Sequence, residues 1–572
     1  MSKIRPERAY AKVSIASFGG INGNADLCSN AAADMRNLRI CTDGSLEKRC
    51  GWISQFQFNH TVRGIWQGSL KDGYLRFAVA GPTIYRIEDD DTLTSIGTLD
   101  ASYQPVHFER YGDHLYLLDG TVIRVYDPAL EQFAEALGYI PLYGYNWHPT
   151  NLGDIKEPLN LLSRKLRVHY LNTTGNTVIN LPFFAQSVDR VRVNNKPVID
   201  YSFLTGSDYL TLSSGVIGST VEVAFTISGE NALGQQLLQA ADSYLYRDGT
   251  REKMILFGAP EGYRLFCSSG VTTEMLNYCK VFYPNCDPLY VQQNHALTIG
   301  DADNPITALA TNYDRILAFH TNGAWSVSFS NDDSEILAYP ALNDLGCTAK
   351  GAALTFGNDI VVVNQSGVCR LHSTASDPDS FAVTNLSEKI AGKLSVGLKE
   401  SACLYWDPVL QELWVRDTSE PEDGLVWIWN ASLKEWYSFD GIFASFFFSL
   451  NGKIAFAADH RICVFSSAQY TDNGKAYETY YQSGYLSFAH PEAVKRSLRA
   501  SLCVKNNRSQ LTLTVITEND VRQTQFWGTS AAHPCHLDRR FALGRFRFFS
   551  YRLSCTGDTG LRVFMANFFT NL

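Results

Sequence analysis

Residues 306–329 read ITALATNYDRILAFHTNGAWSVSF, and this stretch holds three runs of alternating apolar residues that are divided by turn residues at 312–314 and 322–323. Such alternation predicts β-strands with one buried face, and Asn, Asp and Gly close tight turns between strands. The design recurs, in whole or in part, in five other segments, which are residues 74–87, 106–127, 352–371, 402–429 and 443–465.

This recurrence predicts a β-propeller. A small sheet cannot bury both of its faces alone, so that similar sheets must cover one another, as they do in radial β-repeats. A pair of β-sandwiches with meander hairpins is the alternative, but six similar units are more than one sandwich needs. The composition favours an all-β chain, because 13% of the 572 residues are aromatic, 42 are Gly and only 5 are Met. With 45% hydrophobic and 19% charged residues, the chain is not disordered on compositional grounds.

Two segments depart from the repeat. Residues 164–227 have a β pattern of their own, and we interpret 151–235 as an inserted β-sandwich-like domain, which a short helix at 231–242 follows. Residues 475–572 contain long alternating strands and are interpreted as a C-terminal β-sandwich. The remaining divisions are propeller parts at 61–150 and 236–474, and an N-terminal strand and turn region at 1–60 that closes the propeller or contacts neighbours.

Charge is distributed unevenly along the chain. From residue 480 onward twelve Lys or Arg face five Asp or Glu, a net charge of +7, which leaves −16 for the preceding part of a chain whose total is −9. This polarity indicates two surfaces with different partners. Guanidinium groups match phosphate and carboxylate, so the candidates for interface or phosphate contacts are Lys495, Arg496, Arg499, Arg539, Arg540, Arg545, Arg547 and Arg552. A solvated face whose arginine stems cover apolar surface is the alternative.

The sequence carries no motif for catalysis or metal binding. It lacks GxSxG, a P-loop, HExxH and a strand-associated GxGxxG. The segment HPCH at 533–536 has metal-ligand residue types without partners at zinc-finger spacing, and Pro305 stands where a calcium loop at 300–305 needs Gly. We therefore expect a protein that is not an enzyme and has no catalytic residues, no metal and no cofactor.

Cysteine usage and hydropathy bear on the compartment. Thirteen Cys without a CxxC pair indicate mostly buried free thiols in a reducing environment. The N-terminus has charge but no apolar segment, and no stretch of 18 uncharged apolar residues occurs. We expect synthesis in the cytoplasm and no stable membrane insertion.

Short motifs along the chain resemble those of a known family. The segments are FGGIN at 18–22, DMRNL at 34–38, DGSLEKRCG at 43–51, IGD at 299–301, PITAL at 305–309, YDRILAF at 313–319, NGAW at 322–325, LSEKI at 386–390, WYSFDG at 436–441 and YTDNG at 470–474. Together they resemble the tail hub proteins of tailed phages, and above all the packaged-DNA stabilisation or nozzle proteins of short-tailed phages. The resemblance covers most of the chain outside 150–240.

The resemblance implies a structural virion protein of the phage tail. Family members form a ring that attaches below the portal and adaptor rings and that retains and conducts packaged DNA. The implied partners are further copies of the chain in a ring that we expect to be six-fold, the portal or adaptor ring, other tail proteins and the DNA in the channel.

Two other functions stay open at this point. One is a receptor- or glycan-binding tail protein, in which aromatic side chains stack on sugars, and the less favoured one is a polysaccharide-degrading propeller enzyme. The aromatic candidates alternate within strands, which favours packing inside the blades; they are Trp406, Trp414, Trp427, Trp429 and Trp436.

Overall fold

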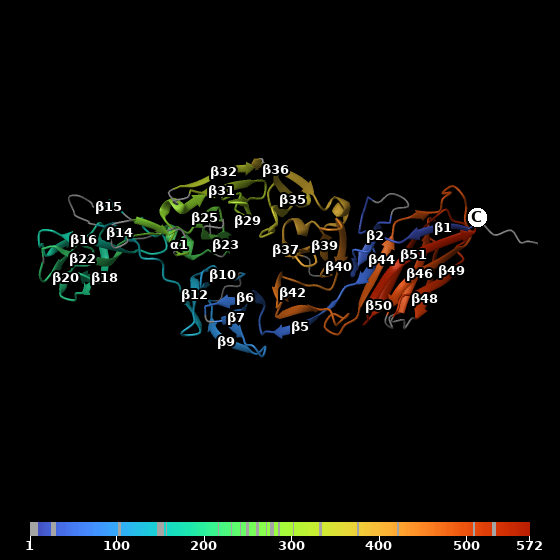
Figure 1. Ribbon diagram of the computed structural model, residues 1–572, viewed down its shortest axis with the longest axis horizontal. Coiled ribbons are helices and arrows are strands. Elements are labelled where there is room, and N and C mark those ends of the chain that lie inside the picture. The colour runs from blue at the N-terminus through green and yellow to red at the C-terminus, as the bar shows by residue number, and fades with distance from the viewer. Residues whose placement is uncertain are drawn as a thin grey trace, which may run out of the picture. The chain divides into compact units, whose positions relative to one another are not determined.

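The computed structural model is built almost wholly of β-strands (Figure 1). It describes residues 10–24, 30–71, 73–100, 105–145, 154–155, 157–215, 217–229, 232–240, 242–247, 251–258, 262–269, 271–274, 280–283, 287–300, 302–330, 335–374, 377–419, 423–506, 510–528 and 533–571. The chain divides into two compact units, Arg63–Gly346 and Met1–Val62 with Cys347–Leu572. The fold is a β-propeller with an inserted β-domain and a C-terminal β-sandwich, as the sequence predicts, and each unit is described in turn.

Arg63–Gly346 contains four antiparallel sheets of four strands each. The first is β6 (Val62–Leu70), β7 (Gly73–Ala80), β8 (Thr83–Ile87) and β9 (Leu93–Thr98), and the second is β10 (His107–Tyr111), β11 (His114–Leu118), β12 (Ile123–Asp127) and β13 (Gln132–Glu135). The third is β23 (Asp242–Arg247), β24 (Glu252–Phe257), β25 (Arg264–Cys267) and β28 (Ala296–Thr298), and the fourth is β29 (Ala308–Asn312), β30 (Arg315–Phe319), β31 (Ala324–Phe329) and β32 (Ile336–Leu342).

The third of these sheets has no counterpart among the six predicted repeats. Its strand β24 reads EKMILF and is buried from Lys253 onward. Between β25 and β28 the chain forms a separate hairpin, β26 (Val271–Glu274) and β27 (Lys280–Tyr283), and the short 3-10 turn η1 (Gln293–His295). Because of these insertions, this blade extends from Asp242 to Thr298 and occupies a longer stretch of sequence than the other blades of this unit.

The second unit contributes three further blades. They are β33 (Ala353–Phe356), β34 (Asp359–Asn364), β35 (Gly367–Thr374) and β36 (Asp377–Asn385); β37 (Ala402–Asp407), β38 (Glu412–Asp417), β39 (Val426–Asn430) and β40 (Glu435–Phe439); and β41 (Phe446–Leu450), β42 (Lys453–Ala458), β43 (Arg461–Ser466) and β5 (Gly51–Gln57). In the last blade β5 pairs with β43, so strands distant in sequence complete one sheet. The 3-10 turns η2 (Glu388–Lys393) and η3 (Gly397–Lys399) connect the first two of these blades.

Three blade hairpins share one turn design, which reads DPALEQ at 127–132, DPVLQE at 407–412 and NASLKE at 430–435. In each, the first side chain accepts a hydrogen bond from the backbone N–H of the Leu three residues on. The fifth residue takes the left-handed conformation, with φ of 50° at Glu131, 52° at Gln411 and 56° at Lys434. The Asx-type cap offsets the strain of a positive φ at a residue other than Gly.

The inserted domain has its own core. A six-stranded sheet holds β14 (Leu142–Tyr145), β15 (Asp154–Ile155), β16 (Lys165–Asn172), β18 (Ala185–Val193), β19 (Lys196–Pro197) and β22 (Ser219–Ile227), and a three-stranded sheet holds β17 (Val178–Asn180), β20 (Tyr201–Phe203) and β21 (Tyr209–Leu212). Side chains of both sheets, such as Val168, Val223 and Leu210, form one buried cluster. The helix α1 (Ala232–Leu238) follows.

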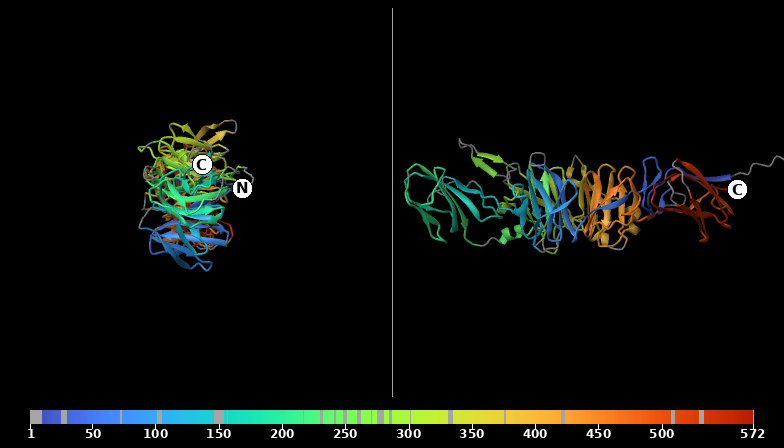
Figure 2. Two further views of the ribbon diagram at one scale, coloured as in Figure 1. Left: turned by 90° about the vertical axis from the view of Figure 1, so that its left-hand side faces the viewer. Right: turned by 90° about the horizontal axis from the view of Figure 1, so that it is seen from below.

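The C-terminal sandwich uses strands from both ends of the chain. One sheet joins β3 (Leu38–Ile40), β4 (Leu46–Lys48), β51 (Leu561–Asn571), β46 (Leu498–Asn506) and β49 (Cys535–Phe541), with β1 (Tyr10–Ile15) also on β51. The other joins β2 (Ala32–Arg36), β44 (Tyr477–Ser483), β50 (Phe548–Gly557), β47 (Gln510–Thr517) and β48 (Arg522–Gly528), with β45 (Leu486–Ser487) on β50. Figure 2 shows the blue N-terminal strands among the red C-terminal ones. The sequence assigned residues 475–572 alone to this domain, and the structure adds β1–β4.

Aromatic side chains from both sheets meet inside the sandwich. The ring of Phe568 on β51 lies 4.8 Å from that of Tyr551 and 5.1 Å from that of Phe549, both on β50. Each of these side chains is buried, and such aromatic pairs contribute about 0.5–1.5 kcal/mol beyond their buried area.

The cysteines of the described residues are all free, and five are buried: Cys267, Cys347, Cys369, Cys463 and Cys555. Burial raises the pKa of Cys403 to about 11 and that of Cys463 to about 12. In the part of the chain that the structure describes, no helix is long and apolar enough to cross a membrane.

Candidate functional site

Arg49, which lies between β4 and β5, is the centre of a buried polar junction. Its guanidinium donates to both carboxylate oxygens of Asp472, over 2.8 and 2.6 Å. It also donates to the side-chain oxygen of Asn37 over 2.8 Å and to the backbone oxygen of Asp440 over 3.0 Å. The guanidinium carbon lies 3.9 Å from the centre of the Tyr477 ring, which is a cation–π contact. Only 1% of the Arg49 side chain is exposed.

Asn37 links the same junction to the sandwich. Its side-chain amide donates to Asp440 Oδ1 over 2.6 Å and to the backbone oxygen of Glu478 over 2.7 Å, while its side-chain oxygen accepts from the backbone N–H of Asp440 over 3.1 Å. Its φ is 55°, a conformation that Asn tolerates better than most residues. The residue after Asp440 takes part as well, because the backbone oxygen of Gly441 accepts a hydrogen bond from the Trp52 indole over 3.3 Å.

A second arginine pair lies on β3. Arg39 donates through Nε and Nη2 to the two carboxylate oxygens of Glu412, over 2.6 and 2.9 Å. Glu412 also accepts from the Tyr437 hydroxyl over 2.5 Å and from the Trp414 indole over 3.2 Å. Burial disfavours the charged guanidinium, but the charge and hydrogen bond of Glu412, together with Tyr437 and Cys50, outweigh that effect and raise the pKa of Arg39. Burial is the main cause that raises the pKa of Tyr437, and Glu412 adds to it.

These contacts explain many of the motif residues that carry the family resemblance. Residues from 34–38, 43–51, 436–441 and 470–474 come together around Arg49, although they are far apart in sequence. Lys48 belongs to the same region, since its Nζ donates to the backbone oxygen of Gly557 over 2.6 Å. Gly51 is also required there, because a Cβ on it would lie 1.9 Å from the Thr471 oxygen. The junction joins a propeller blade to the sandwich.

The eight basic candidates do not form a single row. Lys495 does not belong with the others, because it is buried and its ammonium donates to the backbone oxygen of His490. Arg552 pairs with Glu478 over 3.2 Å and stacks on the Tyr480 ring at 3.6 Å. Arg547 is exposed, and its Nε donates to the Glu492 backbone oxygen over 3.3 Å. The remaining candidates are exposed: Arg496, Arg499, Arg539, Arg540 and Arg545.

Two of them share a row on the outer face of the sheet β1–β51–β46–β49, which we call the basic face. In the strand register Lys12 is opposite Phe569, Phe569 is opposite Arg499, and Arg499 is opposite Arg540. The Lys12 ammonium and the Arg499 guanidinium lie 5.8 and 5.5 Å from the centre of the Phe569 ring. Asp538 pairs with Arg499 over 3.2 Å, so the row keeps a surplus of positive charge.

Sequence reasoning identified Arg499 and Arg540, and it named Phe569 among the apolar side chains that docking could bury, but it missed Lys12. The alternation in YAKVSI at 10–15 was the available signal that Lys12 is on a strand. Its pairing with β51 depends on a contact between the two ends of the chain, which sequence spacing does not reveal.

The other candidate chemistries find no support in the described residues. No group of three His, Cys, Asp or Glu side chains among them could hold a metal ion. Cys535 and His536 are successive residues of β49, so their side chains point to opposite faces of the sheet. The tryptophans considered for sugar stacking are packed inside blades: Trp414, Trp427, Trp429 and Trp436 are buried, and Trp406 packs on Phe356 with ring centres 4.9 Å apart.

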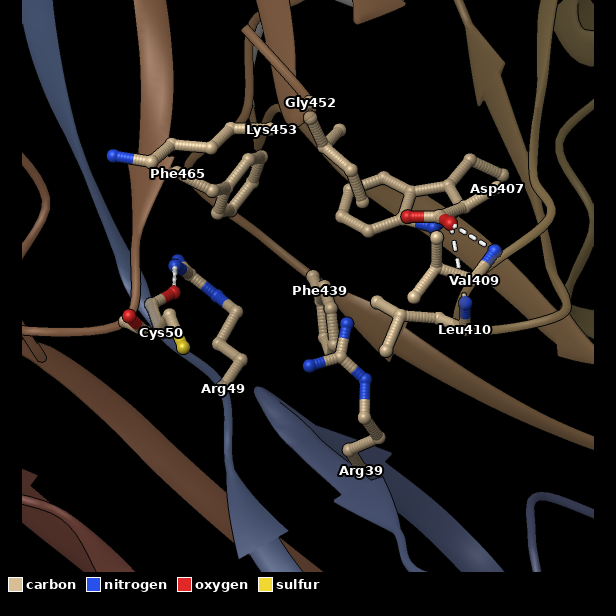
Figure 3. A pocket seen from close by; sticks show the side chains of 13 residues that line it. Arg39, Arg49, Cys50, Asp407, Val409, Leu410, Phe439, Gly452, Lys453 and Phe465 are labelled. Carbon is tan, nitrogen blue, oxygen red and sulfur yellow. Dashed lines mark hydrogen bonds between the residues drawn. The ribbon is translucent and has the colours of Figure 1, made fainter.

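A pocket of about 240 Å³ lies beside the two arginine pairs (Figure 3). Its walls include the aromatic rings of Trp414, Phe439 and Phe465. Its other lining residues come from the turn between β37 and β38, from Gly452 and the start of β42, from Ser467 directly after β43, and from the segment around Arg39 and Arg49.

No family model and no curated protein matches the chain. Comparison with solved structures finds weak backbone similarity to other proteins, including the following three. Virginiamycin B lyase from Staphylococcus aureus has 7% identity and a TM-score of 0.34, over 72% of this chain and 97% of that one. Hsv2 from Kluyveromyces lactis has 8% identity and a TM-score of 0.24, over 67% and 98%. An exo-β-1,3-galactanase from Phanerochaete chrysosporium has 10% identity and a TM-score of 0.18, over 80% and 95%. At these values the three structures carry no argument about the chemistry of this chain.

Proposed function

We propose that this chain is a structural virion protein: a ring-forming subunit of a phage tail hub or nozzle that attaches below the portal or adaptor ring and retains and conducts packaged DNA. The proposal includes assembly of several copies into one ring and a location in the virion. It includes no catalytic step, metal or cofactor.

The observation that carries the proposal is the convergence of the family-like motifs on the Arg49 junction. Asn37, Lys48, Arg49, Gly51 and Asp472 are drawn from three of those motifs, and all of them contribute to one buried connection. Residues that define how a blade joins the sandwich are expected to be shared by proteins of one architecture. This supports reading the motifs as a family signature and not as chance matches.

The basic face supports a docking role within the proposed ring. Lys12, Arg499 and Arg540 present positive charge around Phe569, on a chain whose larger part is acidic. Exposed ion pairs contribute only about 0.2–1 kcal/mol each. In a closed ring the same contact is repeated around the symmetry axis, so that weak pairs act together.

The proposal is tested by disrupting the gene in the genome that carries it. We expect DNA-filled heads that lack complete tails and lose their DNA to nuclease, and restoration by the wild-type chain supplied in trans. Electron microscopy and nuclease-resistant DNA are the measurements. Complete tails with retained DNA would overturn the proposal, and loss of host adsorption alone would favour a receptor-binding protein.

Charge reversal tests the docking role separately. Arg499→Glu with Arg540→Glu should leave the chain folded by circular dichroism but fail to restore tails. The matched control is Lys350→Glu with Arg522→Glu, which changes the charge equally at exposed positions outside the basic face. Full restoration by both double variants would show that the basic face is only a solvated surface.

A further inference from the structure

The pocket beside the arginine pairs has the chemistry of a binding site. Apolar surface on Leu410 and Ile454 adds to its three aromatic rings. Val409, at its rim, is 86% exposed and extends this apolar surface. Filling an apolar pocket that has an apolar rim with another apolar group is favourable, because apolar surface on both sides is removed from water.

The charged groups that line the pocket are predominantly positive. Lys453 is exposed as the first residue of β42, and the Arg39 side chain is 21% exposed. The nearby carboxylates are already engaged: Glu412 accepts from three side chains, and Asp407 accepts from the backbone N–H groups of Val409 and Leu410 over 2.8 and 3.1 Å. A negative group placed at the mouth therefore meets the Lys453 ammonium and the exposed part of the Arg39 guanidinium, whose charge Glu412 offsets in part.

The size favours one anchoring side chain over a cofactor. Small-molecule sites commonly span about 300–1,000 Å³, and this pocket has about 240 Å³. Protein partners frequently insert one aromatic or aliphatic side chain into such a hollow, and these contacts dominate the binding energy.

We propose that this pocket binds a segment of a partner protein that places one large apolar side chain in the pocket and carboxylates at its mouth, beside Arg39 and Lys453. The site is distinct from the basic face and does not depend on the proposed function. A partner at the pocket must offer both an apolar side chain and negative charge. A partner at the basic face needs only negative charge.

The pocket can be probed on the purified full chain with 8-anilinonaphthalene-1-sulfonate, which combines an aromatic group with an anion. We expect saturable fluorescence enhancement, and displacement of the dye by an acetylated and amidated Asp-Trp-Asp tripeptide. The corresponding Lys-Trp-Lys tripeptide should displace it at least about tenfold less well, because the lining is cationic.

Two variants place the binding in this pocket. Leu410→Asp and Lys453→Glu should each weaken dye binding by about tenfold or more. Leu130 provides a matched control, since it occupies the same position of the same turn design in another blade and is exposed. Leu130→Asp should leave dye binding unchanged.

Three results would overturn the proposal. The first is the absence of a saturable dye site, and the second is equal displacement by the acidic and the basic tripeptides. The third is self-association of the wild-type chain, measured by sedimentation, that Leu410→Asp abolishes and Leu130→Asp preserves. That result would assign the pocket to a second copy of the chain.

Discussion

Arg49 and Asp472 form a bidentate ion pair, with N–O distances of 2.8 and 2.6 Å, although their positions in the sequence differ by 423. Both side chains are almost fully withdrawn from water. Burial raises the pKa of the Asp472 carboxyl above its ordinary value, and the hydrogen bonds and charge of Arg49 oppose that rise. The pair is therefore costly to form alone and depends on the other donors and acceptors of the junction.

Removing one partner of this pair should be strongly destabilising. Arg49→Met leaves the Asp472 carboxylate buried and unpaired, and breaking a buried pair in this way costs about 3–5 kcal/mol. The free energy of unfolding, measured in urea, should fall by that amount. Arg190→Met is the control, because Arg190 forms an exposed pair with Glu222 at 2.9 Å, and such pairs contribute about 0.2–1 kcal/mol. Equal losses in the two variants would contradict a special role for the junction.

Gly51 should tolerate no side chain. An Ala at this position would place its Cβ 1.9 Å from the backbone oxygen of Thr471, so that one of the two backbones would have to shift. We expect Gly51→Ala to lower the melting temperature clearly. Gly97→Ala is the comparison, since its nearest contact would be 3.6 Å from the Ile84 side chain, an ordinary packing distance. A melting temperature that Gly51→Ala leaves unchanged would show that the loop at 471 adapts.

The repeated blades were predictable because their signal is local. Residues 308–329 alternate within each strand and turn at Asn and Gly, so three strands can be located without knowledge of the rest of the chain. The blade at 242–298 was missed, since a separate hairpin lies between its third strand and its fourth. This insertion interrupts the regular succession of strands and turns on which the prediction rests.

The site was less predictable than the fold. Lys495 has the residue type of a surface contact, but its position beside Phe488 and His490 depends on loop packing that composition does not encode. The contact of Arg49 with Asp472 and that of Lys12 with Phe569 both join distant segments. Motif resemblance located the residues of the junction, whereas spacing gave no reason to bring them together.

Glu109 should make stability depend on pH. Burial raises its pKa to about 7, and the carboxylates of Asp242 and Glu252 add to the rise while Arg247 opposes it. The unfolded chain ionises this group near its ordinary pKa of about 4.3. The folded chain keeps the proton on Glu109 until about pH 7, whereas the unfolded chain loses it near about pH 4.3. The stability of the fold therefore has its full value below about pH 4.3, with respect to this group, and decreases as the pH rises through 7.

Glu109→Gln removes this titration. The variant should match the wild type at pH 4 and be more stable than it at pH 8, as measured by urea midpoints at the two values. Glu135→Gln, an exposed change on β13 of the same blade, should leave the difference between the two pH values as it is in the wild type. If Glu109→Gln and the wild type lose stability equally between pH 4 and pH 8, another group causes the dependence.

The N-terminal segment should be essential for folding of the remaining chain, whereas the inserted domain should be dispensable. Removing residues 1–49 takes away β1, which pairs with β51 over six residues, together with β2, β3, β4 and Arg49. This leaves one side of β51 and β44 unpaired and exposes the aromatic core of the sandwich, so we expect insoluble protein. The inserted domain packs its own core, and its ends are already joined by a hydrogen bond from the Ile227 N–H to the Arg164 oxygen over 2.9 Å.

Replacing residues 165–228 with a short Gly-Ser linker should leave the remaining blades folded, because Arg164 and Ile227 already lie side by side and a shorter connection loses less entropy on folding. Of the inserted sheet only β14 and β15 remain in this variant, without their partner β16. We expect soluble protein whose near-ultraviolet circular dichroism and unfolding midpoint for the remaining blades resemble those of the full chain. The whole inserted domain, residues 142–229, should fold when it is expressed separately and should show strand signals of its own. Soluble, folded protein from the N-terminal deletion, or aggregation after excision of the inserted domain, would reverse the assignment of which segment the remaining fold requires.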